Sequence, residues 1–153
     1  MKQLKTGVIG CGKVGSFHAR AYAQLPGSQF AAVCDADRAR AEAFAAQWGV
    51  RAYTDVERMC REAQLDVVSV CTPHPLHANP AVTAADCGCH VLVEKPLAAT
   101  LADCDAIIEA GERGHVTIGT MVQRRFYRPC MRIRQAIDDG KLGRPVLGMV
   151  TML

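Results

Sequence analysis

A glycine-rich stretch near the start of the sequence has the residue types of a phosphate-binding turn. It directly follows the apolar run Thr6–Ile9 and consists of Gly10, Cys11, Gly12, Lys13, Val14 and Gly15. Gly10 would permit a tight turn, Gly12 a close approach of the backbone to a pyrophosphate, and Gly15 the packing of a helix on a strand. The first N–H groups of that helix would face the phosphates. Alone, such a turn is weak evidence for a ligand.

An acidic residue stands where a dinucleotide site requires one. Asp35 follows the next apolar run, Phe30–Cys34, about 20 residues beyond Gly15, where a carboxylate can accept hydrogen bonds from the adenosine ribose. Turn and acid together predict a site for NAD, because the carboxylate would repel the 2′-phosphate of NADP. Arg38 and Arg40 keep NADP open, since either could pair with that phosphate or simply lie in solvent.

Two further clusters end later apolar runs. The first contains Cys71, Thr72 and Pro73 with His77 close behind, and the second is Glu94-Lys95-Pro96. Ligands of open parallel sheets bind outside the carboxyl ends of the strands, so both clusters are candidates for contact with a cofactor or substrate. The alternatives are purely structural roles, in which the prolines only end strands and His77 only caps a helix. Lys95 could stabilise alkoxide charge during hydride transfer, although such a tripeptide is more often a surface turn.

The pattern of the chain predicts an α/β fold with a doubly wound parallel sheet, a Rossmann fold. Short apolar runs alternate with stretches of helical spacing, and most of the runs are apolar on successive residues, as in strands covered on both faces. The expected strands are Thr6–Ile9, Phe30–Cys34, Val67–Cys71, His90–Val93 and Val116–Val122. One expected helix carries Leu101, Cys104 and Ile108 on the face assigned to the core.

The composition changes after Val122, which predicts a dinucleotide-binding domain over residues 1–122 and part of a second domain over residues 123–153. The second part would hold a helix with Cys130, Ile133 and Ile137 on one face, then an apolar strand over residues 145–153. Such a strand needs partners at its edges. We therefore expect a chain cut short within the second domain, which either forms a homo-oligomer through this segment or aggregates.

Composition excludes several other classes. The 153 residues contain no uninterrupted apolar run of the roughly 18 residues that a membrane helix needs. Eight scattered cysteines, none in a spacing typical of zinc, indicate small buried hydrophobes in a reducing cytoplasm and no metal site. The net charge of +3 is too small to imply nucleic acid, despite the arginines between Arg124 and Arg134.

The motifs in this order, and Glu94-Lys95-Pro96 above all, resemble the Gfo/Idh/MocA family of oxidoreductases over the full chain. The resemblance implies a domain that binds NAD or NADP, with Lys95 between nicotinamide and substrate as the catalytic residue and Glu94 positioning it. It also implies that Gln123 and Arg124 lie near the nicotinamide. Substrates of the family are usually sugars, inositols or related polyols, oxidised at a secondary alcohol.

Two features depart from the family pattern. His74 stands where asparagine is common and Cys89 where lysine is common. The family also has a second α/β domain that supplies the histidine regarded as general base, and only its opening helix and first strand are expected here. We therefore expect a dehydrogenase in the full-length parent, and the alternative for this chain alone is a non-catalytic dinucleotide-binding module or sensor.

Overall fold

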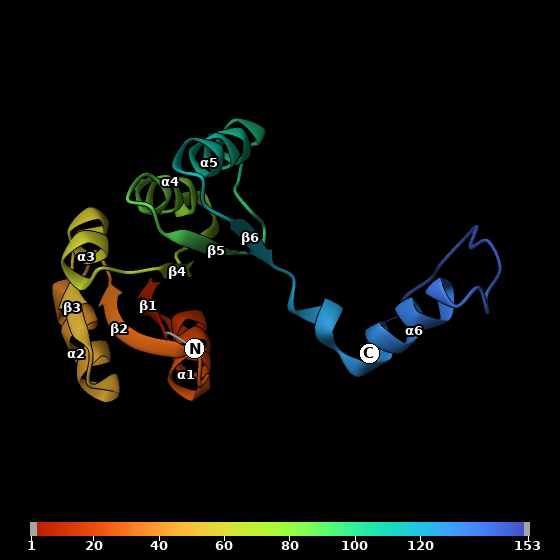
Figure 1. Ribbon diagram of the computed structural model, residues 1–153, viewed down its shortest axis with the longest axis horizontal. Coiled ribbons are helices and arrows are strands. Elements are labelled where there is room, and N and C mark those ends of the chain that lie inside the picture. Colours follow the sequence, from red (N-terminus) through yellow and green to blue (C-terminus); the bar gives the residue numbers. More distant parts are fainter. Residues whose placement is uncertain (1–2, 152–153) are drawn as a thin grey trace. The chain divides into compact units, whose positions relative to one another are not determined.

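The computed structural model describes residues 3–151, and its larger compact unit ends at Met121. This unit is built on a six-stranded parallel sheet with the order β3-β2-β1-β4-β5-β6 (Figure 1). The strands are β1 (Leu4–Ile9), β2 (Ser28–Cys34), β3 (Arg51–Tyr53), β4 (Val67–Val70), β5 (His90–Glu94) and β6 (Ile118–Met121). This strand order is that of the Rossmann fold and confirms the doubly wound sheet expected from the sequence.

Five helices connect these strands. They are α1 (Lys13–Gln24), α2 (Arg38–Trp48), α3 (Val56–Ala63), α4 (Ala78–Asp86) and α5 (Leu101–Gly114). Short polar side chains start three of them: Asp37, Asp55 and Thr100 each accept a hydrogen bond from a backbone N–H in the first turn. The glycine turn, in contrast, starts α1 without a side-chain cap, which leaves its first N–H groups for another acceptor.

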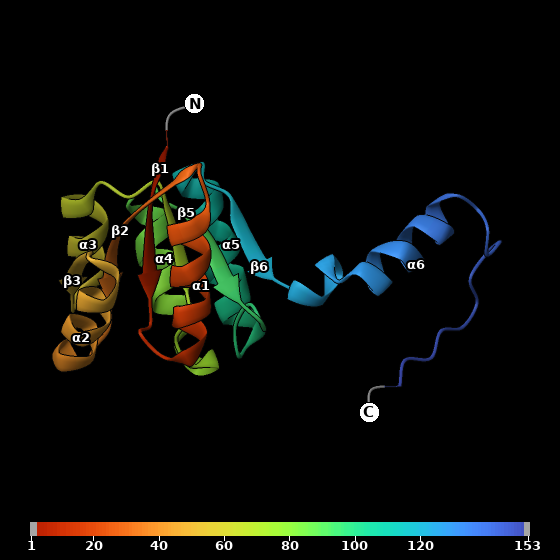
Figure 2. The same ribbon diagram turned by 90° about the horizontal axis from the view of Figure 1, so that it is seen from below.

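The sheet separates two apolar clusters, because neighbouring residues of a strand point to opposite faces. Val8 and Val33 pack with Ala19 of α1 and Phe44 of α2. On the other face, β1 and β2 residues pack with residues of α3, α4 and α5, among them Ile107. Figure 1 shows α4 and α5 on one side of the strands and α1 on the other, and Figure 2 shows the same layers after a quarter turn.

Some expected elements differ in the structure. The strand expected over Val116–Val122 is shorter, and the three-residue strand β3 was not expected at all. The apolar face assigned to α5 was wrong, because Leu101 is 83% exposed and Ile108 is 47% exposed. The helix instead packs through Ile107 and Ala110, which are completely buried.

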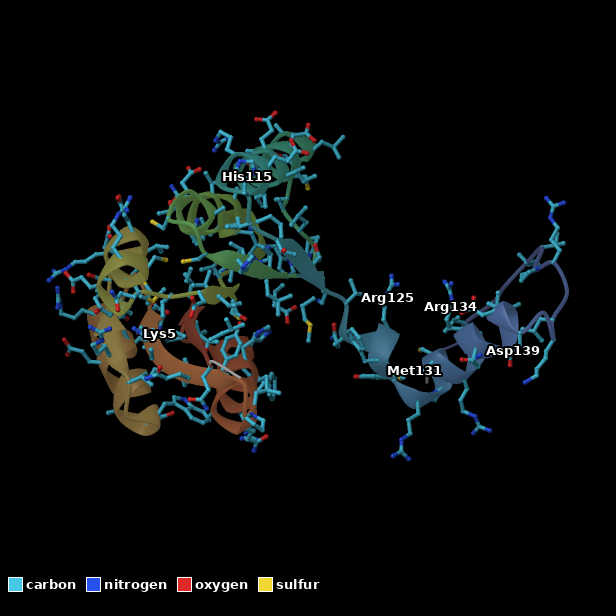
Figure 3. The ribbon with its side chains drawn as sticks, in the orientation of Figure 1. Lys5, His115, Arg125, Met131, Arg134 and Asp139 are labelled. Carbon is cyan, nitrogen blue, oxygen red and sulfur yellow. The ribbon has the colours of Figure 1, made fainter. Side chains whose placement is uncertain are left out.

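A second compact unit begins at Val122. It contains the 3-10 turn η2 (Gln123–Phe126) and the helix α6 (Arg128–Asp138), from which Met131 and Arg134 project (Figure 3). The strand expected over residues 145–153 is not formed over residues 145–151, whose backbone has no strand partner and whose apolar side chains are exposed. Met152 and Leu153 lie outside the described residues. The domain roles assigned to 1–122 and 123–153 stay predictions.

Within residues 3–151, no helix combines the length and the apolar character needed to cross a membrane. The same residues bring together no group of three or more histidine, cysteine or acidic side chains that could hold a metal ion.

Candidate dinucleotide site

The candidate site lies where the strand order reverses, between β1 and β4. Two hollows of about 610 and 570 Å³ open at the carboxyl ends of these strands and of β2. Both hollows are lined by Asp35, Arg40, Thr72, Pro73 and Pro75, so they form one continuous groove. Gly10 lines the larger part, and Gly12, Lys13, Val14, Cys71 and His74 line the other. In open α/β sheets, ligands bind at this switch point.

Two glycines of the turn are required by the fold itself. Gly10 has φ of +97°, and a Cβ built there would lie 2.7 Å from the carbonyl carbon of Cys71. A Cβ on Gly15 would collide with the carbonyl oxygen of Gly10. These positions let β1 pass close to the end of β4 and let α1 pack against the turn, so they would be glycine with or without a ligand.

Gly12 differs from both. Its φ is −88°, which any residue can adopt, and a Cβ there would meet no protein atom within 4 Å. Packing therefore gives no reason for glycine at this position. Because Gly12 lines the groove and directly precedes α1, the missing side chain leaves room for a group that approaches the helix N-terminus. These features fit a bound pyrophosphate.

Asp35 is tied to the glycine turn. Its carboxylate accepts hydrogen bonds from the backbone N–H groups of Cys11 at 2.9 Å and Asp37 at 3.0 Å. The Nη1 of Arg40 lies 3.3 Å from the same carboxylate, whose residue has a side chain only 9% exposed. The acid is therefore held at the end of β2 with one face in the groove, where the ribose hydroxyls of a dinucleotide would reach it.

Arg38 and Arg40 are the two arginines that could pair with the 2′-phosphate of NADP. The structure brings Arg40 to the groove, whereas Arg38 does not line it. Asp37 caps α2, and Arg40 in its first turn folds back toward Asp35 and Asp37. Arg38 points away, lies 3.8 Å from Glu42 and lines another hollow. Since Arg40 offsets part of the Asp35 charge, the acid excludes a 2′-phosphate less strongly than the sequence suggests.

His77 does not have the accessible position expected of a cofactor contact. It is completely buried, with Nδ1 2.9 Å from the carbonyl oxygen of Pro96 and Nε2 3.0 Å from that of Thr72. Carbonyl oxygens only accept hydrogen bonds, so a neutral ring, which carries one N–H, donates to one of these two oxygens, and only a protonated ring donates to both. In this structure the His77 ring has no exposed surface for contact with a cofactor, and its assignment as a cofactor-binding residue stays a prediction.

Lys95 is exposed at the carboxyl end of β5, directly after the half-buried Glu94. Its backbone N–H donates to Glu94 Oε2 at 3.2 Å, and Glu94 Oε1 lies 3.1 Å from Nε2 of His18. The Nδ1 of His18 is in turn 3.0 Å from the hydroxyl oxygen of Ser69. Sequence reasoning missed His18. Its spacing of three residues from Gly15, which packs against a strand, places it on the sheet-facing side of α1 and could have marked it.

The cysteines around the groove have no nucleophilic character. Burial raises the pKa of Cys11 to about 12, and the nearby Asp35 carboxylate adds to this effect. Burial likewise raises the pKa values of Cys34 and Cys71 to about 12. At neutral pH these thiols are protonated, which excludes thiolate catalysis by them. The expectation of buried cysteines is wrong for Cys130, which is exposed.

Gln123 and Arg124 belong to the second unit, in the turn η2. Their expected place beside a nicotinamide stays a prediction.

The sheet order, the open glycine turn and Asp35 define this chain as a dinucleotide-binding protein of the Rossmann class. Residues 4–122 match the model of the Gfo/Idh/MocA family, an oxidoreductase family with an NAD-binding Rossmann fold. The chain therefore belongs to this family. This confirms the family and the NAD-binding fold that the motifs indicate.

Relatives show what the family includes. Inositol 2-dehydrogenase of Salmonella typhimurium is 35% identical over 150 residues, covering 94% of this chain and 44% of the relative. D-apiose dehydrogenase of Paraburkholderia graminis is 35% identical over 154 residues, covering 99% and 40%. The crystal structure of the WlbA dehydrogenase from Bordetella pertussis, in complex with NADH and UDP-GlcNAcA, superposes with a TM-score of 0.88 at 27% identity, covering 94% and 44%. The chain thus spans less than half the length of these relatives.

Proposed function

We propose that this chain forms the nucleotide-binding part of an NAD-dependent dehydrogenase that oxidises a secondary alcohol of a sugar, inositol or related polyol. The observation that carries the proposal is the groove at the switch point. There a side chain at Gly12 would meet no protein atom, Asp35 is fixed by the N–H of Cys11, and Lys95 directly follows the strand β5, which neighbours β4 in the sheet. The names of the relatives, which are dehydrogenases of inositols and sugars, support the substrate class.

Each proposed role follows from the chemistry of the residue. The N–H groups at the start of α1 and the open position at Gly12 would hold the pyrophosphate, and Asp35 would accept hydrogen bonds from the adenosine ribose. The dinucleotide supplies hydride transfer when it is bound. The ammonium of Lys95 would donate a hydrogen bond to the substrate hydroxyl oxygen and stabilise the negative charge that develops there.

The base that removes the hydroxyl proton would come from outside the Rossmann unit. His77 is completely buried between two carbonyl oxygens, and His18 is held by Ser69 and Glu94. A general base has to reach the proton it removes. Neither ring has that freedom in this structure.

NADH fluorescence titration and steady-state kinetics test the proposal. We expect the 153-residue chain to bind NADH, and the whole protein that carries this unit to reduce NAD with a polyol from a panel of sugars and inositols. Lys95→Ala should lower kcat about 100-fold or more with nearly unchanged NAD affinity. Lys141→Ala is the matched control, because Lys141 lies in the second unit and pairs with Asp139.

Three results would contradict parts of the proposal. No NADH binding at millimolar concentration by a folded sample would exclude the nucleotide role. Tighter binding of NADPH than of NADH would overturn the role given to Asp35. Binding without turnover by the whole protein on the panel would favour the non-catalytic module.

A further inference from the structure

The turn that carries Lys95 is held at two backbone atoms by two different chains of hydrogen bonds. On one side, the Lys95 N–H donates to Glu94 Oε2 at 3.2 Å, and the other carboxylate oxygen of Glu94 meets His18. On the other side, the carbonyl oxygen of Pro96 lies 2.9 Å from Nδ1 of His77. Both histidines are buried, with His18 8% and His77 0% exposed.

The hydrogen bonds around His18 have one consistent direction. An ionised carboxylate only accepts, so Nε2 of His18 donates to Glu94 Oε1 across 3.1 Å. In the neutral ring, Nδ1 then accepts from the Ser69 hydroxyl at 3.0 Å, and the Ser69 oxygen accepts from the Tyr22 hydroxyl at 2.7 Å. Each polar group from Tyr22 to Glu94 thereby has its partner, and the ring and the carboxylate have one defined orientation.

His77 connects two neighbouring strand ends. Its Nε2 lies 3.0 Å from the carbonyl oxygen of Thr72, in the loop after β4, and its Nδ1 reaches Pro96 in the loop after β5. The ring lies directly before α4, whose Pro80 and Ala81 are buried. The position of the Lys95 turn is therefore coupled to the loop that lines the cofactor groove through Thr72 and Pro73.

Stability alone gives little reason for these histidines. A buried imidazole has to be fully hydrogen-bonded to avoid a penalty, whereas an apolar side chain of similar volume fills such a position without that requirement. The two rings lie in different elements, His18 in α1 and His77 before α4, yet both hydrogen-bond networks end on the same turn. The feature they share is the fixed backbone around Lys95.

We propose that His18 and His77 are positioning residues, which orient Lys95 from two sides for the reaction; the proposal rests on the function proposed above for Lys95. His18 acts through the carboxylate of Glu94, and His77 acts through the carbonyl group of Pro96. Neither ring touches substrate or cofactor. Their effect is on the direction in which the exposed Lys95 side chain leaves the end of β5.

Matched substitutions distinguish the hydrogen bonds made by the two ring nitrogens of each histidine. His18→Leu removes both hydrogen bonds, whereas the amide of His18→Gln can keep a donor near Nε2, toward Glu94. His77→Asn keeps a donor near Nδ1, toward Pro96, and His77→Gln keeps one near Nε2, toward Thr72. The control is His115→Asn, because His115 is exposed at the end of α5 and has φ of +51°, which asparagine tolerates well (Figure 3).

Two measurements read the effect on the turn. In the 153-residue chain, NMR hydrogen exchange of the Lys95 amide should become about tenfold faster in His18→Leu and stay unchanged in His115→Asn. In the whole protein, His18→Leu and His77→Gln should lower kcat about tenfold or more, with KM for NAD changed less than about twofold. His18→Gln and His77→Asn should recover most of the lost kcat.

A double-mutant cycle separates positioning from a merely structural role. If His18 acts through Lys95, His18→Leu should cause no further loss of kcat in a Lys95→Ala background, whereas a general structural defect would add to the loss. Glu94→Ala should reproduce the kcat loss of His18→Leu, and it serves as the second variant if His18→Leu does not fold.

The outcomes distinguish this proposal from the function on which it rests. Additive losses in the cycle, or wild-type Lys95 exchange rates in both His18→Leu and Glu94→Ala, would overturn the positioning role of His18. Equal kcat for His77→Asn and His77→Gln would overturn the role assigned through Pro96. A wild-type protein without any NAD-dependent turnover would refute the proposed dehydrogenase instead, and the exchange rates would still decide whether the histidines hold the turn.

Discussion

Alanine at each glycine of the turn should separate glycines that the fold requires from the one that a ligand requires. At Gly10, the positive φ costs about 1–3 kcal/mol for alanine, and the Cβ contact of 2.7 Å with the Cys71 carbonyl carbon adds overpacking of about 1–3 kcal/mol. We expect Gly10→Ala to lose about 2–6 kcal/mol of unfolding free energy. Gly15→Ala, whose Cβ would collide with the Gly10 carbonyl oxygen, should lose about 3 kcal/mol or more.

Gly12→Ala should behave differently. Its backbone conformation is ordinary and its Cβ would meet no protein atom within 4 Å. A compatible alanine gains about 0.4–1 kcal/mol through the unfolded state, and the loss of glycine at the start of α1 offsets a similar amount. The unfolding free energy should therefore stay within about 1 kcal/mol of wild type, while NADH affinity should fall at least about tenfold, or about 1.4 kcal/mol. Gly12→Val should abolish binding.

Urea denaturation and NADH fluorescence titration of the 153-residue chain give both quantities. Gly27→Ala is the control, because a Cβ there also meets nothing within 4 Å but lies in the loop between α1 and β2. It should leave NADH binding unchanged and should raise the unfolding free energy by no more than about 1 kcal/mol. The reasoning is refuted if Gly12→Ala binds NADH as tightly as wild type, or if it loses as much stability as Gly15→Ala.

Three further outcomes are expected. Ser69→Ala should lower the unfolding free energy by about 2 kcal/mol in urea titrations, because it leaves the His18 ring and the Tyr22 hydroxyl without the partner they share; an unchanged midpoint would contradict that network. Iodoacetamide at pH 8 should modify the exposed Cys130 well before Cys11, since burial raises the pKa of Cys11 to about 12 and little of its thiolate is present at pH 8. Mass spectrometry gives the order of modification, and modification of Cys11 first would contradict the prediction. Deleting residues 144–153 should reduce self-association in light scattering, because Val146 is 93% exposed among other apolar side chains; the same oligomeric state with and without them would exclude this segment as an interface.

The fold of the first unit could be predicted from local sequence. The end of strand β2, Ala32–Cys34, is buried on both faces and therefore consists of successive apolar residues, a signal that needs no knowledge of the neighbouring strands. The glycine turn could likewise be recognised, since it depends on backbone conformation and on one close approach. Strand β3 was not predicted from the sequence because it has only three residues at the sheet edge, with Arg51 exposed.

The helix faces were less predictable. Helical spacing in α5 permits several apolar stripes, and only packing on the sheet decided that Ile107 is buried while Ile108 is exposed. Spacing also could not decide between Arg38 and Arg40, because the start of α2 at the Asp37 cap sets which arginine returns to Asp35. The apolar residues 145–151 have the composition of a strand, yet strand formation needs a partner edge, and the described chain offers them none.

The class of site could be predicted from the residues alone: a glycine turn between strand and helix, an acid after the second expected strand, and a lysine that follows the expected strand His90–Val93 closely. These features are local, because each depends on a few consecutive residues and on the order of strands. The hydrogen bonds that hold the Lys95 turn, in contrast, depend on contacts between distant parts of the chain. His18 and Glu94 are 76 residues apart in the chain, and only the packing of α1 against the sheet brings His18 Nε2 to 3.1 Å from Glu94 Oε1. Contacts of that kind give no periodic pattern in the sequence, since histidine and glutamate are each residue types that usually lie at the surface.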